Sequence, residues 1–217
     1  MAATVSQIEI NRPEAVRAAS RSQLYRLLAS ALYFPTAELA QQLSPGSFRQ
    51  QVSELASGLP YALAVPGNLG QGGPTDLEPQ YLALFEVGGE LGPPAPLYEG
   101  HYGGGRNAVM EECLKFYHYF GMKLSDRKDR ELPDHLAVEL EFMHVLTFKE
   151  ASAIEGGQDP KPYRLAQRDF LERHLVDFTS RLAQRMPQAS AYTGIVALTD
   201  AFCRAELAYL SPLVSSA

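Results

Sequence analysis

Apolar residues recur at helical spacing in most of this chain, and stretches rich in glycine and proline separate the periodic segments. Between residues 11 and 35 the recurring residues are Val16, Ala19, Leu24, Leu27, Leu28, Ala31 and Leu32. Most of them fall at the intervals that bring side chains to one face of an α-helix. No segment shows the strict alternation of a half-buried β-strand. The pattern predicts an all-α protein built as a globular helical bundle.

The same spacing predicts several further helices. They are expected over residues 37–43, 48–56, 75–87, 107–121, 134–151, 162–187 and 192–210. Asn11 precedes Glu14 by three positions, as in a capping box at the start of the first helix. Asp134 directly follows Pro133, which is typical of an N-cap. Pro212 is expected to end the last helix, because proline lacks the backbone donor that a helix needs.

Flexible segments connect the predicted helices. The sequence VPGNLGQGGPTD, residues 65–76, favours many conformations, and we expect a hinge loop near 66–74. The sequence ELGPPAPLYEGHYGGGR, residues 90–106, is also expected to lack regular structure. We expect residues 1–217 to form a single domain. The hinge leaves open whether the chain is a monomer or a dimer that exchanges helices.

Charge and composition exclude several classes of partner. The chain has 25 acidic and 19 basic residues, a net charge of −6, which disfavours attraction to nucleic acid or anionic lipid. It begins with no secretory-signal pattern and has no apolar run of about 18 residues. We therefore expect a cytoplasmic protein with no stable membrane insertion. Cys113 and Cys203 form no paired motif and are expected to be buried, reduced thiols.

The stretch LPDHLAVELEFMHVL, residues 132–146, raises the question of a metal site. His135 and His144 are nine residues apart, about 900° of helical rotation, so they leave one helix on nearly opposite sides. They cannot share one ion. His135 and Glu139 share a face, but one imidazole and one carboxylate more often form an ion pair or hydrogen bond. We expect no metal site and no resident cofactor.

No catalytic residue is predicted. The chain lacks the G-x-S-x-G elbow, and neither cysteine has a nucleophile signature. The run GHYGGGR could present backbone amides to an anion, yet it matches no phosphate-loop motif and follows no predicted strand. A nucleotide-binding enzyme is thus the weaker alternative to a binding protein.

Aromatic residues are concentrated in the middle third of the chain. They are Tyr81, Phe85, Tyr98, Tyr102, Phe116, Tyr117, Tyr119 and Phe120. Such residues are commonly core, but tyrosines in Gly- and Pro-rich loops often form amphipathic contact surfaces. Asp134 and His135, near these aromatics, are read either as helix-start residues alone or as part of a contact surface.

Four sequences resemble the TorD/DmsD/NarJ-like family of chaperones for maturing molybdenum enzymes. They are EPQYLALFEVGG, PPAPLYEGHYGGGR, LPDHLAVELEFMHVL and FLERHLVDF. The resemblance spans roughly residues 78–178 and is strongest to the branch that serves type II dimethyl-sulfoxide-reductase-family enzymes. The chain departs from several relatives in having no tryptophan.

The resemblance implies an all-helical chaperone without a cofactor of its own. Its partner would be the twin-arginine leader of a molybdopterin-containing catalytic subunit, held in the cytoplasm until the cofactor is inserted. Matched motif by motif, the family's peptide-binding residues fall on Asp134, His135, Tyr81, Leu84, Phe85, Tyr98 and Gly105. An all-α adaptor for another helical client is the alternative.

These assignments predict an open apolar groove with an acidic edge. Tyr81, Leu84, Phe85 and Tyr98 would cover the apolar part of the leader. Asp134 would bind its guanidinium groups, with Glu86, Glu90 or Glu99 as further carboxylates. Replacing Asp134 or His135 by alanine should then weaken leader binding with little change in the thermal midpoint. The client and its substrate are not predicted.

Overall fold

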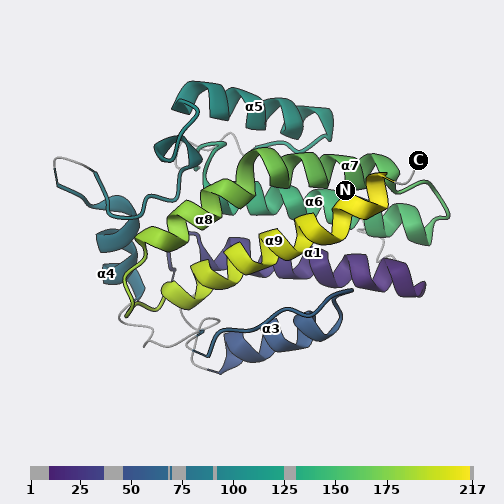
Figure 1. Cartoon of the computed structure of the whole chain (residues 1–217), viewed down its shortest axis with the longest axis horizontal. Helices are drawn as coiled ribbons and strands as arrows, with labels where there is room; N and C mark the ends of the chain where they lie inside the picture. The colour runs from purple at the N-terminus through teal and green to yellow at the C-terminus, as the bar shows by residue number, and fades with distance from the viewer. Residues whose placement is uncertain are drawn as a thin grey trace, which may run out of the picture.

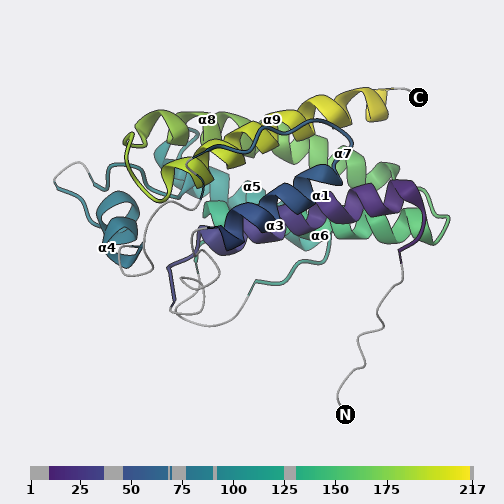
Figure 2. The ribbon, with the colours of Figure 1, turned by 90° about the horizontal axis from the view of Figure 1, so that it is seen from below.

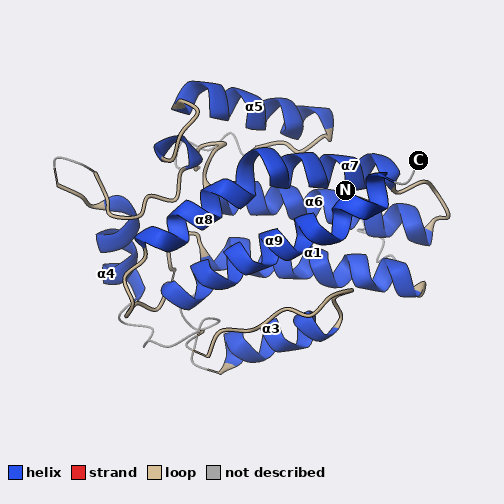
Figure 3. Ribbon diagram, in the orientation of Figure 1, coloured by secondary structure: helices blue, strands red, loops and turns tan. Residues whose placement is uncertain are grey.

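The computed structural model describes residues 10–36, 46–67, 69, 77–89, 92–124 and 131–215. Its α-helices are α1 (Pro13–Ala31), α3 (Ser47–Ser57), α4 (Leu77–Tyr81), α5 (Arg106–Tyr119), α6 (Leu136–Glu155), α7 (Lys161–Phe170), α8 (Val176–Arg185) and α9 (Thr193–Ser215). No strand occurs among these residues (Figure 3), which confirms the predicted all-α class. The predicted helix 37–43 and most of the hinge at 66–74 lie outside the described residues.

Helix α6 lies at the centre of the bundle and packs along α1. Its sequence is apolar on most sides, and 13 of its 20 residues are buried. A helix of that kind belongs inside a protein. Helix α7 packs on α6, α9 packs on α7 and α1, and α8 packs on α9. In Figure 1, α5 lies on one side of the long helices, α3 on the opposite side and α4 at one end, and Figure 2 also places α4 at the end.

Two helix ends differ from prediction. Asn11 and Glu14 form no capping box: α1 follows Arg12 without a side-chain cap. Instead, a Glu155 carboxylate oxygen accepts hydrogen bonds from the backbone N–H groups of Asn11 (3.0 Å) and Arg12 (2.9 Å). Helix α9 runs to Ser215 and contains Pro212, which was expected to end it. So close to the end of α9, a proline removes little of the helical hydrogen bonding.

The predicted helix 162–187 contains a change of pitch. Residues Leu171–Leu175 form one π-helical turn between α7 and α8, and Leu82–Glu86 form another directly after α4. Single π turns are rare and recur at functional sites. His174 lies in the first of these turns, where it is 3% exposed.

A network of buried charges joins α1, α6, α7 and α9. The guanidinium of Arg21 is 1% exposed and donates to Glu206 (2.7 Å), to Glu150 (2.7 Å) and to Gln167 (2.6 Å). Arg164 donates to the other Glu150 oxygen at 2.7 Å. Burial alone would raise the pKa of Glu150, but Arg21, Arg164 and Gln167 outweigh it and hold that pKa below its ordinary value. The charged groups of this region are all paired, whereas the buried hydroxyl of nearby Tyr25 has no hydrogen-bond partner among the described residues.

Candidate functional site

The candidate site lies at the start of α6, where the proline-rich loop runs alongside it. The N–H of Leu136 donates to the carbonyl of Leu97 at 2.8 Å, and the N–H of Glu99 donates to the carbonyl of Asp134 at 2.9 Å. Tyr98 and His135 form an isolated antiparallel bridge between these bonds. The pairing supplies partners for backbone groups at a buried helix start. It also brings together residues that the sequence assigned separately to a peptide site.

Asp134 does not cap α6, contrary to prediction. It is 0% exposed, and one carboxylate oxygen accepts from the backbone N–H of Gly100 at 3.2 Å. Its other oxygen has no hydrogen-bond partner among the described residues. Burial raises the pKa of Asp134, while the Gly100 hydrogen bond and nearby Arg106 oppose the rise. Asp134 therefore holds the loop at Gly100 in place.

His135 is the N-cap of α6. Its Nδ1 accepts from the backbone N–H of Ala137 at 3.2 Å, which requires a neutral ring with its proton on Nε2. The ring is 0% exposed, and burial lowers its pKa to about 3. It stacks on Tyr33 (centroids 6.0 Å apart) and meets Tyr98 edge-on at 4.9 Å. A neutral His135 supports two tyrosines and forms no ion pair with Glu139.

Tyr81 and Phe85 lie in the core, not on a groove. Each is 1% exposed, and both pack against Tyr192, at 5.8 and 5.1 Å between centroids. The Tyr81 hydroxyl donates to the carbonyl of Leu32 at 3.3 Å. Leu84 is half-buried against the same core. The expected open groove is therefore corrected: in this conformation the protein's own side chains enclose the two aromatic rings, Asp134 and His135.

Half-exposed aromatic and acidic residues lie above this enclosed layer. We call them the acidic aromatic rim; its members are Tyr33, Phe34, Glu86, Tyr98, Glu131 and Glu141. The Tyr98 hydroxyl donates to Glu131 at 2.6 Å. Burial raises the pKa of Glu141, and the nearby Tyr33 hydroxyl opposes the rise. The pKa of Glu86 is raised by burial and by the nearby charge of Glu131. Phe34 is 41% exposed, and its ring meets Tyr81 edge-on.

Sequence reasoning missed four of the six rim residues. Tyr33 and Phe34 lie near the end of the segment LYRLLASALYFP, Glu131 directly precedes the segment LPDHLAVELEFMHVL, and Glu141 lies inside it, yet none of these positions stands out by spacing. Tyr98 and Glu86 were predicted to contact the peptide. Glu90 lies outside the described residues.

Glu99 and Gly105 lie on the other side of the loop. Glu99 does not join the rim; its carboxylate is 2.9 Å from Nδ1 of His174. Gly105 has φ +78° and precedes α5 as its N-cap. A Cβ there would meet nothing within 4 Å, so the backbone conformation, not space, favours glycine. The next residue, Arg106, places its guanidinium 5.6 Å from the centre of the Tyr98 ring.

Comparison with known proteins identifies the family. The model of the family described as nitrate reductase delta subunit matches residues 41–184. This chain belongs to that family. Members of the nitrate reductase delta subunit family include the proteins that the four sequence motifs resembled, so the resemblance is confirmed. In the described part of the chain, no helix is long and apolar enough to cross a bilayer.

Curated relatives are assembly chaperones by name. The selenate reductase assembly chaperone protein of Thauera selenatis is 44% identical over 119 residues, 54% of this chain and 61% of that protein. The perchlorate reductase assembly chaperone protein of Dechloromonas aromatica is 34% identical over 195 residues, 83% of this chain and 84% of that protein. The chaperone protein TorD of Vibrio parahaemolyticus is 29% identical over 54% of this chain and 55% of its own length. The chain covers only 61% and 57% of the selenate and chlorate reductase chaperones.

Proposed function

We propose that this protein is an assembly chaperone, not a catalyst, for a molybdopterin-containing catalytic subunit. It binds the subunit's twin-arginine leader in the cytoplasm before the cofactor is inserted. The names of its relatives support the chaperone role. The acidic aromatic rim is the observation that carries the leader-binding proposal. It combines apolar rings with carboxylates that a cationic, partly apolar peptide requires.

Two kinds of side chain in the rim bind two different parts of the leader. Tyr33, Phe34 and Tyr98 offer partly exposed rings to the apolar stretch of the leader, and each well-covered anchor contributes about 1–3 kcal/mol. Glu86 and Glu131 accept charge-assisted hydrogen bonds from the guanidinium groups. Burial, and then the nearby charge of Glu131, raises the pKa of Glu86, and a bound cation relieves the repulsion between the two carboxylates.

Asp134 and His135 lie beneath the rim and hold its residues in position. Asp134 anchors the loop through Gly100, and the ring of His135 lies against Tyr33 and Tyr98. Both are fully buried, so they influence the leader through the residues above them. Tyr81, Leu84 and Phe85 form the floor beneath Phe34.

Calorimetry with a synthetic twin-arginine leader tests this function. Glu131→Gln and Tyr98→Ala should each weaken binding by more than about tenfold, or about 1.4 kcal/mol. Glu111→Gln is the matched control, because Glu111 is an exposed acid on α5 that pairs with exposed Lys115. Equal affinities in all four proteins would refute the rim as the binding surface.

A second peptide separates arginine recognition from general charge. Replacing both leader arginines by lysine keeps the charge but removes the planar, bidentate donors. We expect this peptide to bind more weakly to the wild type and to lose less when Glu131 is replaced. Identical affinities for the two peptides would show that this surface does not distinguish arginine from lysine.

A further inference from the structure

Three potential metal ligands converge beside the proline-rich loop, and each comes from a different structural element. They are Glu99 in the 3-10 turn Glu99–His101, Cys113 in α5 and His174 in the π turn. One carboxylate oxygen, the thiol sulfur and a ring nitrogen all lie within 4.8 Å of one another. Nδ1 of His174 is 2.9 Å from the Glu99 oxygen and 3.8 Å from the Cys113 sulfur.

Two of the three separations are close to those of a tetrahedral zinc site, and the oxygen–sulfur separation is within 4.8 Å. Zinc bonds of about 2.0–2.3 Å place neighbouring ligand atoms about 3.3–3.8 Å apart. The sulfur–nitrogen separation already has this value. The shorter oxygen–nitrogen distance is that of a hydrogen bond, and it must lengthen by a few tenths of an ångström when an ion replaces the shared proton.

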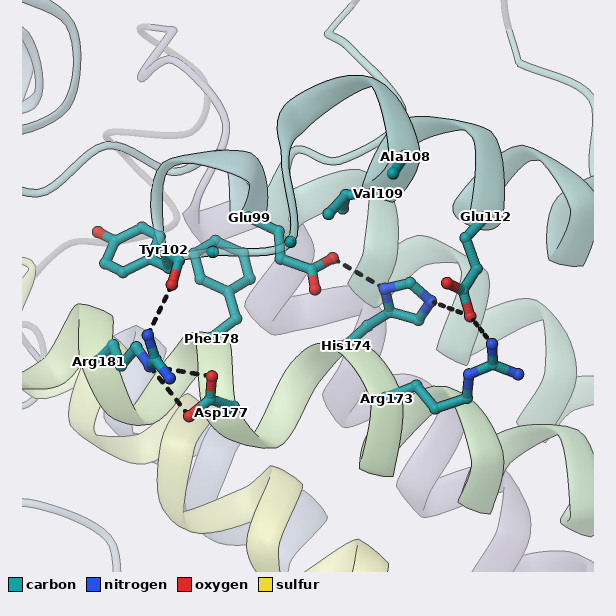
Figure 4. Close-up of a pocket in the computed structure, with 12 residues that line it drawn as sticks. Glu99, Tyr102, Ala108, Val109, Glu112, Arg173, His174, Asp177, Phe178 and Arg181 are labelled. Carbon is teal, nitrogen blue, oxygen red and sulfur yellow. Dashed lines mark hydrogen bonds and ion pairs between the residues drawn. The ribbon is translucent and has the colours of Figure 1, made fainter.

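The second ring nitrogen of His174 lies where a ligand histidine would need it. His174 is 3% exposed, and its Nε2 has no hydrogen-bond partner in the part of the chain described here. The nearest acceptor is a Glu112 oxygen at 3.6 Å, and Figure 4 shows the ring between Glu99 and Glu112. Metal-bound histidines usually donate their other N–H to such a carboxylate. A small closure of this gap would complete that arrangement.

A buried carboxyl group lies beside the cluster. Glu139 is 0% exposed one helical turn beyond His135, and neither of its oxygens has a hydrogen-bond partner among the described residues. Arg173 is paired with Glu112 on the Nε2 side of His174.

A cavity gives an ion a route to this cluster. It has a volume of about 290 Å³, and its wall includes Glu99, Glu112 and His174. Figure 4 shows these side chains together with the Asp177–Arg181 pair across the cavity. The space can hold a water molecule as a fourth ligand.

We propose that Glu99, Cys113 and His174 bind one divalent transition-metal ion of the zinc type, with water as the fourth ligand and Glu112 orienting His174. The mixture of thiolate, imidazole and carboxylate favours zinc over magnesium or calcium. On binding, the Cys113 thiol gives its proton to solvent, the proton between Nδ1 of His174 and Glu99 is lost to solvent, and the remaining ring proton is carried on Nε2. The metal–sulfur and metal–nitrogen bonds form without a redox change. The ion would join α5, the π turn and the loop that carries Tyr98. This proposal does not depend on leader binding.

Cobalt titration of the full chain after chelator treatment tests the site. We expect one Co²⁺ per chain and a near-ultraviolet thiolate-to-metal charge-transfer band that Zn²⁺ abolishes by displacement. Cys113→Ser should lose the band, whereas Cys203→Ser should keep it, because the second buried cysteine, on α9, is not one of the three converging groups. Glu112→Gln should keep the band and weaken affinity by about tenfold, as expected for a residue that only orients a ligand.

X-ray absorption spectroscopy of the zinc-loaded wild type identifies the atoms bound to the metal without the use of a variant. One sulfur and two or three nitrogen or oxygen neighbours are expected. A spectrum with no sulfur, a charge-transfer band that survives Cys113→Ser, or the absence of stoichiometric Co²⁺ binding to the wild type would each overturn the site.

Discussion

Two buried polar clusters lie along α6, and they differ in how completely their groups are paired. Near the C-terminal end, Arg21 uses all three guanidinium nitrogens, and Glu150 accepts from Arg21, Arg164 and Gln167. Near the N-terminal end, one oxygen of Asp134, Nε2 of His135 and both oxygens of Glu139 have no hydrogen-bond partner in the described residues. The two clusters are comparably buried.

The difference separates a structural cluster from a functional one. Buried charges are tolerated when they are paired, and breaking such a pair is costly. Unpaired buried polar groups lower stability, and proteins keep them mainly where a ligand, an ion or a partner uses them. The N-terminal cluster lies between the acidic aromatic rim and the proposed metal site, which is where such use is expected.

Replacing Arg21 should have the largest effect. Arg21→Met leaves Glu150 and Glu206 buried without their main partner, and we expect a loss of about 3–5 kcal/mol in the free energy of unfolding. Chemical denaturation measures this loss. Arg17→Met, an exposed arginine on the same helix, is the control and should change little. A small effect of Arg21→Met would mean that the paired cluster is not structural.

One substitution should act in opposite directions in the two clusters. At neutral pH, Glu139→Gln should stabilise the metal-free protein by about 1–3 kcal/mol, whereas Glu150→Gln should destabilise it. The signs follow from the pKa shifts. A carboxyl whose folded pKa is raised, as in Glu139, costs stability once pH rises above its unfolded pKa of about 4.3. The lowered pKa of Glu150 contributes stability that is lost as pH falls through the folded value.

Denaturation curves at pH values from about 4 to 7 test this pair. The benefit of Glu139→Gln should disappear at the acidic end, where the wild-type carboxyl is protonated in both states. Changes of the same sign in the two variants would contradict the difference between the clusters.

Two substitutions of Asp134 test whether its carboxylate holds the loop at Gly100 in place or contacts the leader directly. The burial of Asp134 revises the sequence-based expectation of an unchanged thermal midpoint. Asp134→Ala removes the acceptor for Gly100, so we expect leader affinity to fall by more than about tenfold and the midpoint to fall as well. Asp134→Asn retains an acceptor and should preserve both. If Asp134→Asn lost affinity at an unchanged midpoint in calorimetry and thermal melts, the carboxylate would contact the leader directly.

Salt should produce the smallest effect and should act on the rim alone. Raising ionic strength from about 0.01 M to about 1 M shortens the screening length from about 30 Å to about 3 Å. Leader affinity, which depends on half-exposed carboxylates, should therefore fall. The stability difference between the wild type and Arg21→Met should change little, because buried pairs are weakly screened. Calorimetry and denaturation at both salt concentrations compare the two.

The sequence by itself determined the helical class, the position of most helices and the family. Helical spacing is a local property, so residues three and four apart in 107–121 or 134–151 reveal their helix without knowledge of the rest of the chain. The motifs around Tyr98 and Asp134 likewise marked a loop and a helix start that lie side by side in the structure. The caps were less predictable. The distant Glu155 bonds the backbone donors of Asn11 and Arg12, and Asp134 bonds the loop at Gly100 and leaves the N-cap position of α6 to its neighbour His135.

Only the tertiary structure decided which side chains meet and which are covered. Tyr81 and Phe85 have the composition of a contact surface, yet packing against Tyr192 encloses them. Glu99, Cys113 and His174 come from three separate elements and converge through a loop and a π turn. No periodic pattern encodes such a meeting, because it depends on how helices pack, and packing is set by the whole core.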